Sequence, residues 1–239
     1  MSPSTSNIAI RLTDVSKTFY IKEKSNDSIM LKFLSLRSKS QKKKIEALKD
    51  INITIERGEF VGIIGHNGSG KSTMLKLITN AFPPDKGGTI EVNGKVIRLS
   101  LGMGFDPNLT ARENIYVNGS ILGLTFKVIG QKFDEIIEFS GLHGFIDTQV
   151  KFFSSGMVSR LAFSIAIHAE ADIFLLDEFF GGVGDADFRK KSDDAFQHLL
   201  RDKTILFVSH EMGQIEKYCD RVICLDHGKI ISDNRSNGN

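Results

Sequence analysis

The sequence predicts an α/β fold with a mostly parallel core sheet, an antiparallel β subdomain and an inserted α-helical subdomain. Short apolar runs alternate with helical stretches in the last third of the chain, which is typical of parallel strands joined by helices. Near the N-terminus apolar and polar residues alternate, as in half-buried antiparallel strands. The part between, at about 106–170, has helical periodicity instead. We expect one domain over 1–239 that contains all three parts.

The first expected elements are two strands, at 8–15 and 51–55, in which apolar and polar residues alternate. Residues 60–64 are continuously apolar, as in a strand that is buried on both faces. A helix is expected over 72–80, because apolar side chains recur there at helical spacing. Its inward-facing residues are Met74, Leu75, Leu77 and Ile78.

A β-hairpin is expected next. The segments 89–92 and 95–99 flank Asn93-Gly94, which is the strongest short signal for a two-residue hairpin turn. Further strands and helices follow after the helical part. They are strands at 173–176, 204–208 and 221–225, helices at 186–201 and 211–219, and a frayed polar tail at 232–239.

The helical part has a clear beginning. Thr110 is followed three residues later by Glu113, which is the capping-box pattern at the start of a helix. Helical spacing of apolar residues continues further along this part, at Phe133, Ile136, Ile137 and Phe139. These features predict a set of packed helices inserted between strands.

Composition describes an ordinary globular chain, with 41% hydrophobic and 25% charged residues among 239. The N-terminus has no leader-like pattern, and no apolar run approaches the roughly 18 residues needed to cross a bilayer, so we expect a cytosolic protein. Cys219 and Cys224 are expected to be reduced, structural thiols. The histidines are scattered singly, so we expect no metal site made of protein ligands alone.

A glycine-rich run follows the strand at 60–64 and fits G-x-x-x-x-G-K-[ST] at every fixed position. Glycines let successive N–H groups point into one concavity, and the next helix presents its positive end to the same anion. Lys71 is expected to reach the β- and γ-phosphates, and Ser72 to bind Mg²⁺. The expected phosphate-binding residues are Gly65, His66, Asn67, Gly68, Ser69, Gly70, Lys71, Ser72 and Thr73.

Two carboxylates follow the apolar run 173–176. Asp177 is expected to hold Mg²⁺ through its water shell, as a strand-end aspartate does in phosphate-loop NTPases. Glu178 stands beside it and is expected to polarise the water that attacks the γ-phosphate. Together with the phosphate loop, these carboxylates predict a site that binds a nucleoside triphosphate with Mg²⁺ and hydrolyses it.

A third motif, Phe-Ser-Ser-Gly-Met at 153–157, opens a helix about twenty residues before Asp177. The order of these motifs resembles the ATP-binding cassette (ABC) ATPases. The family's L-S-G-G-Q motif holds the γ-phosphate of ATP bound to the opposite subunit, so the resemblance implies this role for Ser154 and Gly156. The other three positions of the motif differ from the family's pattern.

Two more site residues follow from the resemblance. His210, after the strand at 204–208, matches the family's switch histidine, which contacts the γ-phosphate and helps to fix Glu178 and the water. The family also stacks an aromatic side chain on the adenine just after the first strand. Phe19 fits this spacing best, and its neighbour Tyr20 stays open as the alternative.

The resemblance covers about 8–231 and is most specific to ATPase subunits that export lipid-linked polysaccharides such as O-antigen or capsule, with teichoic-acid exporters as close relatives. It rests on the Phe-Ser-Ser-Gly-Met variant and on the runs 110–116 and 183–188.

Two positions depart from the family's pattern. The family's usual Mg²⁺-binding glutamine is missing from 99–105, which leaves that ligand position to water or Ser100. Asp185 stands one residue further from Glu178 than we expect for the family's dimer-contacting aspartate.

The resemblance implies a head-to-tail homodimer that traps two ATP molecules, each between Lys71 and Asp177 of one subunit and Ser154 of the other. The expected partners are an integral-membrane permease, the cytoplasmic face of the bacterial inner membrane and, as indirect cargo, a lipid-linked polysaccharide; nucleic acid is not expected. Because the chain ends about 30 residues after His210, we expect no C-terminal domain that reads the polymer. The alternatives are the ATPase of a different ABC transporter and a soluble ABC ATPase that acts on nucleic acid or ribosomes.

A basic segment at about 22–46 has eight basic and three acidic residues, a net +5, which leaves −3 for the rest of a chain whose net charge is +2. It makes the connection between the first two strands longer than a usual hairpin loop. Two interpretations stay open. The segment lies near the anionic cytoplasmic leaflet, where each Lys or Arg contributes roughly 1 kcal/mol, or it is a solvated loop.

Overall fold

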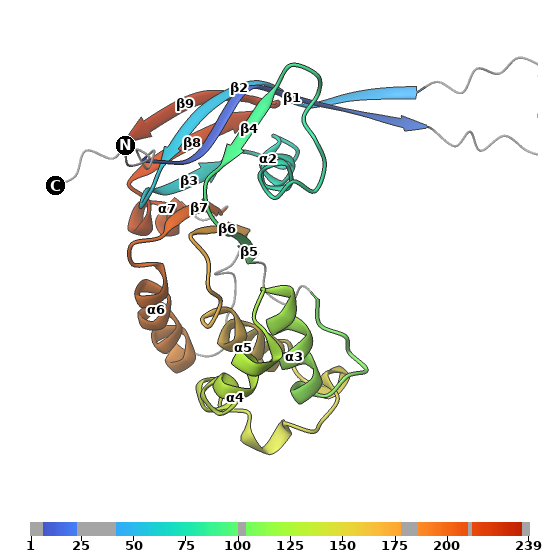
Figure 1. Cartoon of the computed structure of the whole chain (residues 1–239), viewed down its shortest axis with the longest axis vertical. Helices are drawn as coiled ribbons and strands as arrows, with labels where there is room; N and C mark the ends of the chain where they lie inside the picture. Colours follow the sequence, from blue (N-terminus) through green and yellow to red (C-terminus); the bar gives the residue numbers. More distant parts are fainter. Residues whose placement is uncertain (1–6, 23–41, 100–103, 178–185, 210–211, 236–239) are drawn as a thin grey trace, which may run out of the picture.

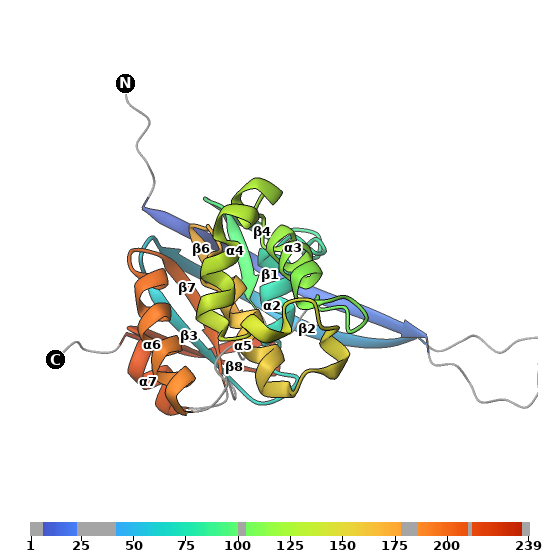
Figure 2. The same ribbon diagram turned by 90° about the horizontal axis from the view of Figure 1, so that it is seen from below.

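A computed structural model describes residues 7–22, 42–99, 104–177, 186–209 and 212–235 (Figures 1 and 2). The described part contains an antiparallel sheet, a mostly parallel sheet and helices that pack against them. The site residues Glu178 and His210, together with Ser100 and Asp185, lie outside these ranges. Among the residues that are described, none of the helices has the length and apolar character required to cross a bilayer.

The antiparallel sheet has the strand order β2-β1-β4. β1 (Ile8–Lys22) pairs with β2 (Lys42–Glu56) along its whole length, and β4 (Thr89–Val92) lies on the other edge of β1. β1 and β2 are both longer than expected and form a ribbon that projects from the rest of the molecule (Figure 1). Residues 42–46 of the basic segment therefore belong to a strand and not to a loop.

The second sheet has the order β5-β6-β7-β3-β8-β9, and all of its neighbouring strands are parallel except the last pair. This confirms the mostly parallel core sheet that the sequence predicts. Its strands are β3 (Phe60–Ile64), β5 (Val96–Leu99), β6 (Ile173–Asp177), β7 (Thr204–Val208), β8 (Arg221–Asp226) and β9 (Lys229–Arg235).

Strand β9 corrects the expectation of a frayed tail, because residues 232–235 belong to it. Two ion pairs fix this strand. Arg221 on β8 donates two hydrogen bonds of 2.7 Å to the carboxylate of Asp233, and Arg235 donates one of 2.9 Å to Glu59. Polar composition alone predicts fraying, whereas the backbone pairing with β8 and these carboxylates keep the strand in the sheet.

The expected hairpin around Asn93-Gly94 is wrong. β4 pairs with β1, while β5 pairs with β6, so the dipeptide joins two different sheets. The backbone N–H of Asn93 donates to the carbonyl oxygen of Ala9 at 2.8 Å, and that of Lys95 donates to Asp172 at 2.7 Å. Each flanking strand therefore has a partner distant in sequence. Ile90 and Val92 of β4 pack against one apolar core, whereas Ile97 and Leu99 of β5 are buried in another.

Three apolar cores hold the elements together. α2 (Lys71–Ile78) packs between the two sheets, and its four predicted inward-facing side chains are all buried there. α6 (Ala186–Leu200) and α7 (Met212–Tyr218) cover the other face of the large sheet (Figure 2). The third core joins α3 (Ala111–Ile121), α4 (Phe126–Ser140) and α5 (Ser155–Ala166), which lie at the end of the molecule remote from β1 and β2 (Figure 1).

Local signals in the helical part are borne out. The Thr110 side chain accepts from the backbone N–H of Glu113, and Glu113 accepts from the N–H of Thr110 at 2.8 Å, so the predicted capping box is present. Two short 3₁₀ turns connect α4 to α5, His143–Phe145 and Val150–Phe152. Neither Cys219 nor Cys224 is in a disulfide, and burial raises the pKa of Cys219 to about 12, which fits the expected structural role.

Candidate functional site

The glycine-rich loop connects β3 to α2, and neighbouring strands determine its shape. Gly65 and Gly70 have φ angles of 148° and 115°. A Cβ atom at Gly65 would lie 2.2 Å from the carbonyl oxygen of Leu225, and one at Gly70 would lie 2.7 Å from that of Ala47. Only glycine fits at either position, because β8 and β2 approach the loop so closely.

The loop presents positive charge at the beginning of α2. The helix begins at Lys71, and no side chain caps its N-terminus. The first N–H groups of a helix have no acceptor within the helix, so they are available to an anion. The Lys71 side chain is buried, and its ammonium donates to the carbonyl oxygens of Gly65 at 2.6 Å and His66 at 3.0 Å. This arrangement fits the phosphate groups of a nucleotide.

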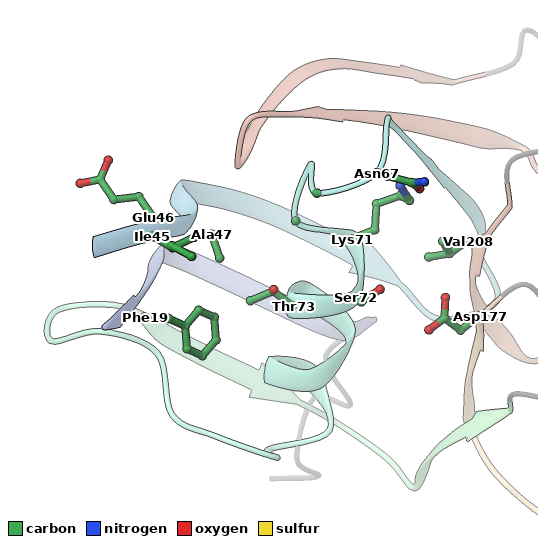
Figure 3. A pocket seen from close by; sticks show the side chains of 12 residues that line it. Phe19, Ile45, Glu46, Ala47, Asn67, Lys71, Ser72, Thr73, Asp177 and Val208 are labelled. Carbon is green, nitrogen blue, oxygen red and sulfur yellow. The ribbon is translucent and has the colours of Figure 1, made fainter. Parts of the chain in front are cut away.

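A pocket of about 340 Å³ opens beside the loop (Figure 3). Eight of the predicted site residues line it: Phe19, Asn67, Gly68, Gly70, Lys71, Ser72, Thr73 and Asp177. Three other loop residues do not line it. Ser69 is buried, Gly65 lies against β8, and the imidazole of His66 contacts Asp226.

The pocket has an aromatic end and a polar end. Phe19 lies at one end, and Ser72 and Asp177 lie at the other (Figure 3). The Phe19 ring packs edge-on against Phe82 with a centroid distance of 5.4 Å. Tyr20 is 64% exposed and does not line the pocket, so the structure brings Phe19 rather than Tyr20 to it. This end therefore offers a flat apolar surface for a base.

The polar end offers oxygen ligands, which Mg²⁺ prefers. Ser72 lies in the first turn of α2, and Asp177 ends β6. Sequence analysis missed a further residue here, Arg98 on β5, whose guanidinium donates to the Asp177 carboxylate. Both side chains are largely buried, at 21% and 15% exposure, and the Nε atom of Arg98 has no hydrogen-bond partner within the described part of the chain.

Ser154 and Gly156 lie apart from this pocket. The Ser154 side chain caps α5 by accepting from the backbone N–H of Met157 at 3.2 Å, so the motif does open a helix as expected. Neither residue lines the pocket, and Ser154 is exposed in the helical part of the molecule. One chain thus brings together the phosphate loop and Asp177 but not the serine motif.

Comparisons with known proteins agree with these motifs. A family model described as ABC transporter matches residues 48–181, which is more than half of the chain. A relative from Myxococcus xanthus, named O-antigen export system ATP-binding protein RfbB, is 47% identical over 200 residues, which are 82% of this chain and 45% of that protein. A protein of the same name from Klebsiella pneumoniae is 44% identical over 79% of this chain and 76% of its own length.

Other relatives carry a second name. Teichoic acids export ATP-binding protein TagH from Lactococcus lactis is 40% identical over 95% of this chain and 48% of that protein. The chain thus spans about half the length of the Myxococcus and Lactococcus proteins. A solved dimeric ATP-binding cassette in a post-hydrolysis state, bound to ADP and Pi, aligns with a TM-score of 0.72 at 23% identity and covers 96% of this chain and 100% of that one. With its motifs in the family's order, the chain therefore belongs to the ABC transporter family and has the fold of an ATP-binding cassette.

Proposed function

We propose that this chain is the ATP-hydrolysing subunit of an ABC exporter that moves a lipid-linked polysaccharide across the bacterial inner membrane. The observation that carries the proposal is the pocket in which Lys71, Ser72 and Asp177 meet beside an uncapped helix N-terminus. Buried positive charge at a helix terminus favours a triphosphate, and the nearby oxygens favour its magnesium ion.

Each residue has a defined task in this proposal. Lys71 and the loop N–H groups bind the β- and γ-phosphates, and Phe19 contacts the adenine. Ser72 and Asp177 would hold Mg²⁺, which supplies charge neutralisation for phosphoryl transfer. Glu178 orients and deprotonates the attacking water, and His210 positions both.

The proposed active form is a homodimer. Ser154 and Gly156 stand at the exposed start of α5, outside the pocket of their own chain. A second copy placed head to tail would bring its α5 N-terminus to the γ-phosphate, where the helix dipole and the serine stabilise negative charge. Closure of this dimer is proposed to move a membrane-embedded permease at the cytoplasmic face of the inner membrane, and hydrolysis reopens it.

The cargo follows from the relatives. Those named for O-antigen export are 44–47% identical to this chain, so we assign O-antigen before capsule or teichoic acid. Relatives named for teichoic acid export favour that polymer as the second candidate, because one of them matches 95% of this chain.

The test combines the purified protein with the cell. Glu178→Gln should still bind ATP and should accumulate a dimer when ATP is added, because closure no longer ends in hydrolysis. In cells that lack the gene, the lipid-linked polymer should accumulate inside, and Lys71→Met should not restore export. ATP binding by Glu178→Gln without any dimer, or normal surface polymer in the deletion strain, would contradict the proposal.

A further inference from the structure

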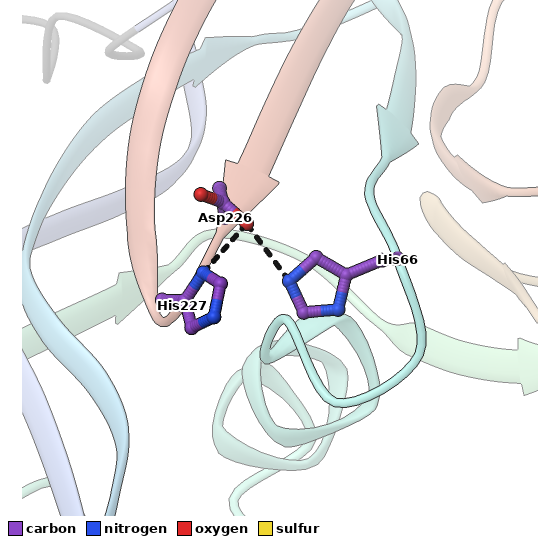
Figure 4. Close-up of side chains that lie close together, drawn as sticks. All are labelled: His66, Asp226 and His227. Carbon is purple, nitrogen blue, oxygen red and sulfur yellow. Dashed lines mark hydrogen bonds and ion pairs between the residues drawn. The ribbon is translucent and has the colours of Figure 1, made fainter.

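A second cluster of functional groups lies on the other side of the phosphate loop. The His66 side chain meets Asp226 and His227 at the turn between β8 and β9 (Figure 4). His66 Nε2 and His227 Nδ1 each lie 2.8 Å from the same oxygen, Oδ1 of Asp226. Donor atoms of the three residues all lie within 4.8 Å of one another. Histidines that are scattered singly in the sequence are therefore brought together by the fold.

The two ring nitrogens of His66 face two different oxygen atoms. Nδ1 lies 2.7 Å from the carbonyl oxygen of Asn67, and the tautomer with its hydrogen on Nδ1 satisfies this contact. In this tautomer Nε2 has a lone pair, which points toward the Asp226 carboxylate 2.8 Å away. An imidazole lone pair and a carboxylate oxygen that lie side by side are both ligands for a metal ion.

The surroundings match those of a metal-binding histidine. Metal-ligating imidazoles typically donate their other N–H to a backbone carbonyl or a carboxylate, as His66 does to Asn67. Two imidazoles and a carboxylate are ligands for Zn²⁺ and similar ions, with water completing the coordination. Metal–ligand bonds of about 2.0–2.2 Å place tetrahedral ligands roughly 3.4 Å apart. The two 2.8 Å distances from the imidazoles to the Asp226 oxygen therefore need to lengthen by about half an ångström.

The three side chains can make this adjustment, and the backbone that carries them is well anchored. The side chains of His66, Asp226 and His227 are 48%, 41% and 79% exposed, which also gives an ion access. The turn itself is fixed at Gly228 by two backbone hydrogen bonds. The N–H of Gly228 donates to the carbonyl oxygen of Ser69 at 2.9 Å, and its carbonyl oxygen accepts from the backbone N–H of Lys49 at 2.8 Å. The cluster thus lies on a rigid frame that already contacts the loop.

We propose that His66, Asp226 and His227 form a binding site for a transition-metal ion of the Zn²⁺ class, which links the phosphate loop to the β8–β9 turn. The ion would bond to Nε2 of His66, to Nδ1 of His227 and to the Asp226 carboxylate. The ion thereby cross-links the second residue of the phosphate loop to the neighbouring strands. Because this site differs from the Mg²⁺ position at Ser72 and Asp177, it does not depend on the nucleotide chemistry proposed above.

The test is a titration of the purified chain with Zn²⁺ alone, without nucleotide, followed by calorimetry. We expect one ion per chain and release of protons on binding, since the ligands must be deprotonated. His66→Gln and His227→Gln should each weaken the affinity by at least about tenfold. Circular dichroism spectra of the variants establish that both remain folded.

Two controls complete the design. His143→Gln removes an exposed histidine that pairs with Glu138 at 2.9 Å and should leave the zinc affinity unchanged. Cys224→Ser tests a free thiol near the turn and should also have no effect. The proposal is overturned if no stoichiometric Zn²⁺ binds, if binding survives both His66→Gln and His227→Gln, or if the NMR signal of His66 Nε2 does not change in the presence of excess Zn²⁺.

Discussion

At the residue scale, Asp177 connects the proposed metal position to the rest of the protein. Its carboxylate ends β6, lines the pocket with Ser72 and accepts from Arg98. Opposite charges that are largely shielded from water interact more strongly than an exposed pair. Arg98 therefore neutralises the carboxylate on which Mg²⁺ binding is proposed to depend, and the two cations compete for it.

Arg98→Met should make nucleotide binding more dependent on Mg²⁺. Without Arg98 the Asp177 carboxylate repels the phosphates of metal-free ATP, while Mg²⁺ no longer has a competitor. The ratio of the Kd in EDTA to the Kd with Mg²⁺ should rise by roughly tenfold, which corresponds to about 1.4 kcal/mol. Fluorescent-nucleotide titrations measure both constants.

A double-mutant cycle separates this effect from a general loss of charge. In an Asp177→Asn background, Arg98→Met should produce no further change in the ratio. Arg11→Met removes an arginine from an exposed pair with Glu91 and should leave the ratio as in the parent. An unchanged ratio in Arg98→Met alone would show that the ion pair does not influence the metal position.

Sequence alone could predict Lys71 and Asp177 but not Arg98, and the reason is physical. The phosphate loop has a fixed spacing because backbone N–H groups, lysine and serine must surround one anion. Arg98 contacts Asp177 from the neighbouring strand β5, and the pairing of β5 with β6 joins segments that are far apart in the chain. His66 is a similar case, because its partners Asp226 and His227 come from a turn on the last hairpin.

At the scale of secondary structure, two hairpins extend the sheets in different ways. The β8–β9 hairpin is held by the ion pair between Arg221 and Asp233. The β1–β2 ribbon has exposed residues at its far end, with Tyr20 at 64% and Ile21 at 50%, paired with Lys44 and Lys43 across the strands. Alternation predicted the inner halves of β1 and β2, but the outer halves carry basic residues that resemble a loop in composition.

The Arg221–Asp233 pair predicts a pH-dependent stability. The hydrogen bond from Arg221 is the main cause that lowers the pKa of the Asp233 carboxyl. A carboxyl group whose pKa is lower in the folded than in the unfolded state contributes its full stabilisation at pH values above the unfolded pKa, about 3.9. It loses this stabilisation as the pH falls through the folded pKa. Asp233→Asn should therefore lower the urea midpoint at pH 7, and the difference from the parent should shrink below about pH 4.

The control for this prediction is Asp147→Asn, which removes the partner of Arg112 in a pair whose carboxylate is 75% exposed. Solvent screens such a pair, so the change in midpoint should be smaller. A midpoint difference for Asp233→Asn that stays constant between pH 7 and pH 3 would show that the carboxylate charge does not stabilise β9.

The end of the β1–β2 ribbon predicts contact with an anionic membrane surface. Exposed apolar side chains beside lysines are typical of segments at a membrane interface, where each lysine contributes roughly 1 kcal/mol. Lys43→Gln with Lys44→Gln should remove about 2 kcal/mol and so weaken binding to vesicles that contain anionic lipid by about thirtyfold. Vesicle co-sedimentation at low and high salt measures this. Lys127→Gln with Lys190→Gln removes two exposed lysines from α4 and α6, and equal weakening in that pair would point to net charge alone.

At the scale of the whole molecule, the pocket and the serine motif occupy different parts of the fold. Strand and helix alternation predicted the mostly parallel sheet, because right-handed crossovers leave few other arrangements. No pattern within one chain reveals what covers the pocket, because in the proposed dimer a second copy covers it. The exposed start of α5 and the polar end of the pocket are each consistent with half of a composite site.

Mixing two inactive variants tests this composite site. Lys71→Met and Ser154→Arg should each abolish ATP hydrolysis as homodimers. In a mixed head-to-tail dimer, one site has Lys71 from one subunit and Ser154 from the other, both intact. Random exchange should then restore about a quarter of the parental sites, which a steady-state ATPase assay detects.

Lys71→Met mixed with Asp177→Asn is the matched control, because both residues belong to the same half-site and no mixed dimer has an intact site. Two outcomes would mean that each chain hydrolyses ATP without Ser154 of its partner. One is equal recovery of ATPase activity in both mixtures. The other is no recovery in the mixture of Lys71→Met with Ser154→Arg, although the two subunits co-purify.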